Sequence, residues 1–174
     1  MKRNNVKKMA FAGVFCALAV VGSLLSFPVL GSKCAPVQHI VNVLCAVLLG
    51  PGYGLGVAFA ASLLRNLLGM GTLLAFPGSM IGAFLGGLAY RKWKKLGAAC
   101  LGEVFGTSVL GGLCAWPMAI LFMGKSAGDV AFYAYIVPFL ISTAVGSALA
   151  WLLLAALSKS KLLARLQAEL NAEK

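Results

Sequence analysis

Residues 34–64 read CAPVQHIVNVLCAVLLGPGYGLGVAFAASLL, 31 consecutive positions without a formal charge. The stretch exceeds the ~18 apolar residues that cross a bilayer as a helix. Its middle, GPGYG at residues 50–54, is a Pro-Gly cluster of the kind that ends one helix and starts the next. The pattern predicts two short helices, Val37–Gly50 and Tyr53–Leu68. They have 14 and 16 residues, which is short for full crossings.

Four further stretches of similar length are almost free of charge. They are Met9–Ser32, Asn66–Tyr90, Leu96–Gly124 with Glu103 alone, and Val130–Ser158. Hydrophobic residues make up 61% of the chain and charged residues 11%, with a mean hydropathy of +0.94. A soluble domain is about 45–50% apolar and 25% charged. This composition excludes a soluble enzyme and predicts an all-α, polytopic membrane protein.

The chain carries 15 Lys and Arg against 4 Asp and Glu, for a net charge of +11. Cytoplasmic loops of membrane proteins collect basic residues, and here they cluster at residues 2–8, 91–95 and 159–174. If residues 34–64 cross the membrane twice, all three clusters share one face. A single crossing would place the first two clusters on opposite faces, so the charge pattern favours two.

The sequence therefore predicts a bundle of six transmembrane helices with both termini cytoplasmic. It puts 12 of the 15 basic residues inside, leaves Lys33 and Lys125 outside, and places Arg65 in the membrane. A re-entrant hairpin at residues 34–64, with four true spans, satisfies the same parity. The positive charge thus marks topology, and we expect no nucleic-acid partner. The predicted spans are Met9–Leu30, Val37–Gly50, Tyr53–Leu68, Thr72–Tyr90, Gly97–Phe122 and Ala131–Leu157.

The spans form one membrane domain, residues 1–158, followed by a polar cytoplasmic tail, residues 159–174. The tail is helix-forming and is expected to lie along the cytoplasmic face. The loops Gly31–Pro36, Gly69–Gly71 and Met123–Val130 are expected outside.

Motifs for catalysis are weak in this chain, so we expect no enzyme, no cofactor and no bound metal. Gly124-Lys125-Ser126 resembles the end of a phosphate-binding loop, but Ala119 stands where its first glycine belongs. The five cysteines show no C-x-x-C spacing. With one histidine, His39, and one aspartate, only a serine activated by His39 remains open as a catalytic arrangement.

Small residues recur at four-residue spacing, which lets membrane helices approach closely. The stripes are Gly78, Gly82 and Gly86; Gly102 and Gly106; and Gly13 with Ala17. Most are expected to pack the bundle itself. The helix that carries Gly13 is apolar on all sides, so its stripe is free to face another membrane protein.

Polar side chains inside the spans gather toward the outer half of the membrane. They are Gln38, His39 and Asn42 at the start of the second span, Arg65 and Asn66 at the end of the third, Ser79 in the fourth and Glu103 in the fifth. A charge at mid-bilayer costs a few kcal/mol, so Arg65 and Glu103 should face the interior, a partner or water. The alternative for Arg65 is a cation that snorkels to the outer headgroups, and the alternative for Glu103 is a buried acid that pairs with hydroxyls or with the loop 91–95.

Three aromatic residues, Phe76, Trp116 and Tyr133, fall on the same outer side. They can stack on a ligand, and interfacial anchoring explains Tyr133 equally well. The polar and aromatic groups together predict a pocket open to the outside, in a protein with no energy source of its own.

Three segments resemble the ThiW family: residues 34–43 (CAPVQHIVNV), 65–83 (RNLLGMGTLLAFPGSMIGA) and 102–107 (GEVFGT). Its members are substrate-binding S components of energy-coupling factor (ECF) vitamin transporters. The resemblance implies a six-helix fold in a bacterial cell membrane that takes hydroxyethylthiazole, a thiamine precursor, from the outside. It implies as partners a transmembrane coupling protein, contacted through Ala10, Gly13 and Ala17, and two cytoplasmic ATPases.

The predicted site suits a flat, neutral thiazole with a hydroxyethyl arm. Phe76, Trp116 or a tyrosine can stack on the ring, and Gln38, His39, Asn42 and Asn66 can form hydrogen bonds. Arg65 suits a phosphorylated or carboxylated substrate better. The alternatives are an S component for thiamine or another vitamin, a stand-alone channel or facilitator for a small solute, and a membrane enzyme that uses His39 or Glu103.

Overall fold

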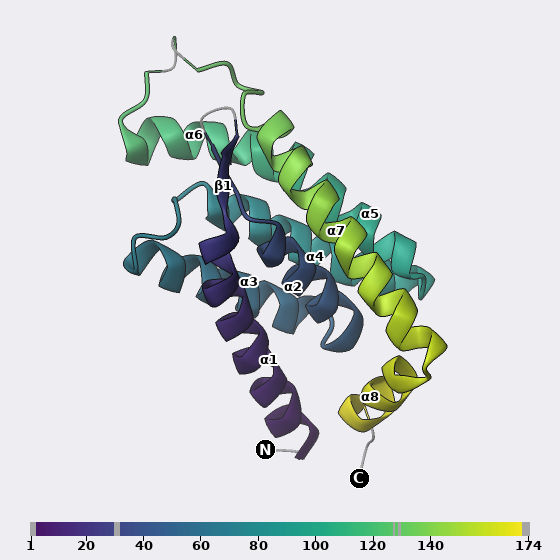
Figure 1. Cartoon of the computed structure of the whole chain (residues 1–174). Helices are drawn as coiled ribbons and strands as arrows, with labels where there is room; N and C mark the ends of the chain where they lie inside the picture. The colour runs from purple at the N-terminus through teal and green to yellow at the C-terminus, as the bar shows by residue number, and fades with distance from the viewer. Residues whose placement is uncertain (1–2, 30–31, 127, 129, 172–174) are drawn as a thin grey trace.

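The computed structural model describes residues 3–29, 32–126, 128 and 130–171 (Figure 1). In chain order the elements are α1 (Arg3–Gly22), the 3-10 turn η1 (Ser23–Leu25), β1 (Phe27–Val29), β2 (Ser32–Cys34), α2 (Pro36–Leu48), α3 (Pro51–Leu67), α4 (Ala75–Trp93), α5 (Leu96–Phe105), the π-turn η2 (Gly106–Gly111), α6 (Gly112–Met123), α7 (Ile136–Lys159) and α8 (Leu162–Asn171). Apart from one two-stranded hairpin, the described residues form helices and loops, as the all-α prediction requires.

Three helical segments are long and apolar enough to cross a membrane: Asn5–Leu25, Leu96–Met123 and Ile136–Lys159. Large apolar side chains such as Val14, Leu121 and Leu152 are exposed along α1, α6 and α7. Exposure of so many large apolar side chains is unfavourable in water, whereas it is favourable in contact with lipid. The chain is therefore an all-α membrane protein.

The split of residues 34–64 into two helices is confirmed. Helix α2 ends at Leu48 and α3 begins at Pro51. Gly50 takes a φ of +89°, a conformation that glycine adopts without steric cost. Pro51 occupies the first turn of α3, where its missing N–H costs nothing.

Helix α2 forms the centre of the bundle. It has 13 residues, of which all but Val37 and Ile40 are buried. It packs against α1, α3, α4, α5 and α7. At about 1.5 Å per residue it is roughly 20 Å long, shorter than the ~30 Å hydrocarbon core. Its surroundings are therefore protein rather than lipid.

The first helix was predicted to end at Leu30. This prediction is wrong, because the helix ends earlier. Helix α1 stops at Gly22, and η1 then leads into the antiparallel strands β1 and β2, where Pro28 pairs with Lys33. Gly22 packs so tightly on Val37 that a Cβ would overlap that side chain. Pro28 lacks an N–H and cannot continue a helix. Within the predicted outer loop Gly31–Pro36, residues 32–34 form strand β2, the second half of this hairpin, and Gly31 lies outside the described residues.

The last long helix begins at Ile136 rather than at the predicted Ala131. Residues 132–135 form a turn instead, in which Ala131 accepts a hydrogen bond from the Ala134 amide at 2.9 Å. The predicted fifth span, by contrast, is confirmed: α5, η2 and α6 follow one another without a break over residues 96–123.

The glycine stripes of the fourth and fifth spans face each other, as expected for bundle packing. Cβ atoms built on the second stripe would lie within 3 Å of the first, in the pairs Gly102–Gly86, Gly106–Gly82 and Gly111–Gly78. Gly111 extends the second stripe of Gly102 and Gly106 beyond what the four-residue spacing predicted, and the π-turn explains why. The π-turn adds one residue to the turn, so that Gly111, five residues after Gly106, still faces α4.

The tail is helical, as predicted, and α8 packs against the end of the bundle that holds the start of α1 (Figure 1). Leu163 and Leu170 are buried there. The Gln167 side-chain amide donates to the Val47 carbonyl at 3.0 Å and to Tyr90 Oη at 2.9 Å. The β hairpin lies at the opposite end of the molecule (Figure 1).

Candidate functional site

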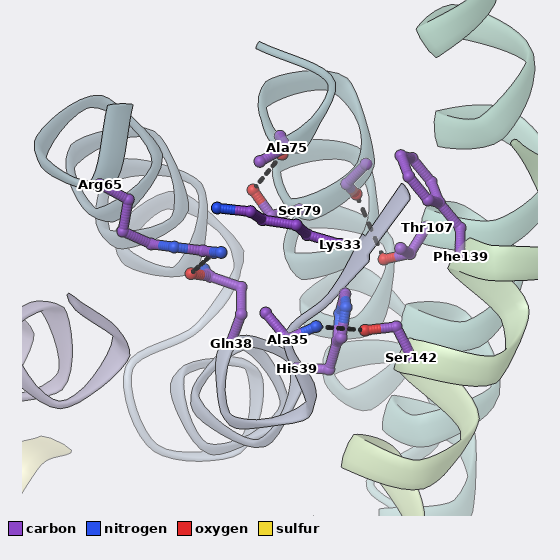
Figure 2. A pocket seen from close by; sticks show the side chains of 11 residues that line it. Lys33, Ala35, Gln38, His39, Arg65, Ala75, Ser79, Thr107, Phe139 and Ser142 are labelled. Carbon is purple, nitrogen blue, oxygen red and sulfur yellow. Dashed lines mark hydrogen bonds between the residues drawn. The ribbon is translucent and has the colours of Figure 1, made fainter. Parts of the chain in front are cut away.

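A small, half-enclosed cavity lies at the hairpin end of the bundle. The start of α2, the end of α3, the starts of α4 and α7, and η2 form its wall, and strand β2 contributes Lys33 (Figure 2). Its volume is about 40 Å³, which holds no more than a few water molecules. The lining residues are Lys33, Ala35, Gln38, His39, Arg65, Ala75, Gly78, Ser79, Thr107, Phe139 and Ser142.

Arg65 enters this cavity from the last turn of α3. The side chain is only 3% exposed, and its Nη1 donates to Gln38 Oε1 at 3.1 Å. Its Nε is buried and has no hydrogen-bond partner among the described residues. The Arg65 carbonyl accepts the amides of Met70 and Gly71 at 2.8 and 3.0 Å, which fixes the end of α3. The side chain points into the protein, which argues against the snorkelling interpretation.

Glu103 lies behind the cavity wall, fully buried in α5. Its Oε1 atom is 2.8 Å from His39 Nδ1 and accepts the Asn42 Nδ2 donor at 3.0 Å. Thr107 Oγ1 lies 3.1 Å from the same oxygen and 3.2 Å from the Gly78 carbonyl. Burial of a carboxylate is costly unless hydrogen bonds and opposite charge offset it. The cluster supplies both, with His39 as the charge partner when protonated.

The second carboxylate oxygen, Glu103 Oε2, is buried without a partner among the described residues. It lies against Gly82 of α4, where a Cβ would come within 2.6 Å of it and would overlap Thr107 Oγ1. Glycine at position 82 therefore provides the room that the carboxylate occupies. The π-turn sets the position of Thr107, and such turns are frequent at functional sites.

The base of the hairpin is fastened to α7 above the cavity. The Ala35 amide donates to Ser142 Oγ at 2.9 Å, and the Cys34 thiol contacts the Pro138 carbonyl at 3.4 Å. Burial raises the pKa of the Cys34 thiol, so the group stays protonated and can act as the donor. The hairpin is thus held over the polar cavity by two contacts.

A model of the thiamine-precursor transporter (ThiW) family matches residues 9–160. The chain belongs to the ThiW family. A search of the curated proteins finds no match for it. The ThiW family is a family of thiamine-precursor transporters, so this membrane protein is a transporter. A half-enclosed cavity with polar side chains on its wall is compatible with binding of a small solute.

In this member of the ThiW family, six of the ten predicted site residues come together. Gln38, His39, Arg65 and Ser79 line the cavity, and Asn42 and Glu103 lie directly behind it. Asn42 connects the two layers, because its Nδ2 also lies 3.2 Å from the Ser79 carbonyl.

The other four predicted residues lie outside the cavity wall. Asn66 Nδ2 donates to the carbonyls of Ser62 and Thr72, so it holds the α3–α4 loop. Phe76 packs on Phe59, with ring centroids 5.8 Å apart. Trp116 Nε1 donates to the Val130 carbonyl at 2.8 Å, and Tyr133 is 57% exposed.

Sequence reasoning assigned no binding role to Lys33, Phe139, Thr107 or Ser142, all of which line the cavity. Thr107 and Ser142 are hydroxyl side chains inside apolar helices, a signal that was visible in the sequence. Phe139, the aromatic residue on the wall, has no such signal. Lys33 reaches the cavity only because residues 27–34 fold back as a hairpin.

The residues predicted to contact a coupling protein, Ala10, Gly13 and Ala17, are exposed on α1. Gly13 borders an apolar groove of about 670 Å³ between α1 and α3. Ala10 and Ala17 lie outside its lining. The groove is formed largely by small residues, among them Ala12, Gly52, Gly56 and Ala60.

Proposed function

We propose that the chain is the substrate-binding S component of an ECF-type importer for hydroxyethylthiazole in a bacterial cell membrane. The observation that carries the proposal is the buried polar cavity at the hairpin end of the bundle. Beneath this cavity the second half of α2 is entirely apolar, from Val43 to Leu48. The polar groups thus gather at one end of the bundle and do not form the continuous stripe that a channel needs.

Six spans with both termini cytoplasmic are the topology that fits this role. The start of α1 and helix α8 lie at one end (Figure 1), joined by the Lys8–Asn171 hydrogen bond. With 12 of the 15 basic residues assigned to that end of the bundle, the positive-inside rule makes it cytoplasmic. The cavity then faces outward, where a scavenged precursor arrives.

In this role, partner chains that hydrolyse ATP supply the energy for uptake. A coupling protein would pack on the small-residue face of α1, where Gly13 and the groove beside it permit close approach of another helix. Two cytoplasmic ATPases would complete the transporter.

The chemistry of the wall suits hydroxyethylthiazole. Phe139 offers an aromatic face, and the His39 ring and the Ser79 and Ser142 hydroxyls offer hydrogen-bonding groups. A cavity of about 40 Å³ is smaller than this nine-heavy-atom ligand requires. Binding therefore requires the hairpin or the wall side chains to move outward.

Binding of hydroxyethylthiazole to the purified full-length protein tests the proposal. We expect saturable binding at micromolar concentration or below in detergent, measured by titration calorimetry. Thiamine serves as the matched competitor. Absence of saturable binding below the millimolar range, with thiamine bound instead, would contradict the substrate assignment.

Uptake in cells that carry the coupling protein and ATPases tests the S-component role. Gly13→Leu should abolish uptake and leave ligand affinity unchanged, because it fills the groove without touching the cavity. Val21→Leu, an exposed position on the same helix, is the matched control and should transport normally. Equal loss of uptake and affinity in the Gly13 variant would show that the groove serves internal packing instead.

A further inference from the structure

We infer that the cavity binds an anionic form of its ligand, a phosphate monoester, through the Arg65 guanidinium with Lys33 as a second cation. The inference rests on the proposed function, since it takes the cavity to be the ligand site. It adds the substrate class: a thiazole precursor whose hydroxyethyl arm carries phosphate.

The Arg65 guanidinium is a buried charge with no carboxylate beside it among the described residues. Arg65 is 3% exposed, and no carboxylate lies within 4.0 Å of it in the part of the chain that the structure describes; the ion pair found there joins His39 and Glu103. Burial of a cation without a counter-charge is strongly unfavourable. An anionic ligand would supply the missing charge, whereas a neutral thiazole would not.

The Arg65 guanidinium has N–H groups without a hydrogen-bond partner in the described part of the chain. Within the described ranges its one hydrogen bond runs from Nη1 to Gln38 Oε1, and Nε has no partner. Gln38 thereby orients the group and leaves without a partner the edge formed by Nε and the second Nη atom. Because Nε is buried, a ligand reaches this edge when the wall moves outward to admit it. That edge binds two oxygens of a phosphate or carboxylate in parallel.

A second cation, Lys33, adds to the positive charge of the cavity wall. Lys33 lines the cavity from β2, and its side chain extends across the pocket toward the side from which Arg65 enters (Figure 2). Glu103 forms no ion pair with either cation among the described residues, and its Oε1 atom faces His39, Asn42 and Thr107 instead. Two cations favour a dianionic phosphate over a singly charged carboxylate.

A further donor completes the site. Ser142 lines the cavity, and its Oγ accepts the Ala35 amide at 2.9 Å; its hydroxyl hydrogen can turn from the Cys34 sulfur to a ligand oxygen. A phosphate would thus meet the Arg65 edge, the Lys33 amine and one hydroxyl. Charge-assisted hydrogen bonds of this kind are roughly twice as strong as neutral ones.

The test compares hydroxyethylthiazole with its phosphate monoester on the purified full-length protein in a neutral maltoside detergent. We expect the monoester to bind at least tenfold more tightly. Equal or weaker binding of the monoester, with the alcohol still bound, would overturn this inference and leave the proposed function standing. If neither compound binds, the proposed function fails and this inference fails with it.

Variants locate the effect. Arg65→Lys keeps the charge but not the two-pronged edge, and it should reduce the preference for the monoester to below threefold. Lys33→Gln should reduce it partially, and because Lys33 is exposed this variant tests the charge without disturbing the bundle. Lys125→Gln, an exposed cation in the outer loop, is the matched control. An unchanged preference in both the Arg65 and the Lys33 variants would overturn the inference.

Phospholipid headgroups also carry phosphate, so a separate titration must test whether Arg65 binds a lipid instead of the ligand. The titration is repeated with added phosphatidylglycerol and, separately, phosphatidylcholine. The preference for the monoester should persist in both. If phosphatidylglycerol alone abolishes it, Arg65 binds a lipid headgroup and the inference is overturned.

Discussion

The two halves of helix α2 are both largely buried but differ in chemistry. The first half carries Gln38, His39 and Asn42, and the second half, from Val43 to Leu48, carries only apolar side chains. Burial of polar groups costs free energy unless each finds a partner. The first half therefore needs Arg65 and Glu103 opposite it, whereas the second half needs only close packing. The difference separates the part of the helix that can recognise a ligand from the part that holds the fold.

The largest expected effect comes from removing the partner of the polar half. Glu103→Ala takes away the acceptor that His39 and Asn42 share. Breaking a buried pair by removing one member costs about 3–5 kcal/mol, so the thermal unfolding midpoint in detergent should fall strongly. Glu169→Ala, at an exposed carboxylate of α8, should leave it nearly unchanged. Similar midpoints for the two variants would contradict the structural role of the cluster.

The next effect concerns the room that the cluster occupies. Gly82→Ala places a Cβ against Glu103 Oε2 and Thr107 Oγ1, and overpacking of this kind costs about 1–3 kcal/mol. Gly56→Ala is the matched control, because nothing lies within 4 Å of a Cβ there. The midpoint should fall for the first variant and stay constant or rise for the second. A fall in both would point to loss of glycine flexibility rather than to the cluster.

These contacts also show which parts of the structure the sequence could predict. The split between α2 and α3 follows from Gly50 and Pro51, which act locally. The end of α1 was missed because residues 23–30 continue the apolar run, and apolar runs alone do not tell a helix from a strand. Tight packing of Gly22 on Val37 decides that end, and it arises only in the folded bundle.

The candidate site was predictable as a set of polar residues but not as a set of pairs. Gln38 meets Arg65 from 27 positions away, and His39 meets Glu103 from 64 positions away. Such pairs depend on which helices become neighbours, and the period of a helix does not reveal that. The aromatic residues show the same dependence: Trp116 and Tyr133 were expected on the outer side of the membrane, and in the folded chain they lie outside the wall of this cavity.

A direct comparison of the two halves of α2 uses neighbouring positions. Asn42→Ala should weaken hydroxyethylthiazole binding at least tenfold, which is the ~1.4 kcal/mol expected when a buried hydrogen bond that orders the wall is lost. Val43→Ala should leave affinity within about twofold and lower stability instead, by about 0.8 kcal/mol per buried CH₂ removed. Calorimetric titration measures the affinity of both variants and thermal unfolding measures their stability, which together test the difference between the two halves of α2. Unchanged affinity in the Asn42 variant would move the binding site elsewhere.

The smallest effect is expected at the other end of α2, where α8 closes the helix. The Val47 carbonyl belongs to the last turn of α2, whose carbonyls lack partners within the helix. Gln167 supplies one by donating to it at 3.0 Å, and it also reaches Tyr90 Oη. Gln167→Ala should therefore cost about 0.5–1.5 kcal/mol of stability and leave ligand affinity unchanged, because the cavity is at the opposite end. Arg165→Ala, exposed on the same helix, is the matched control for the midpoint. Loss of affinity in the Gln167 variant alone would mean that the two ends of α2 are coupled, so that docking of α8 reports on the state of the cavity.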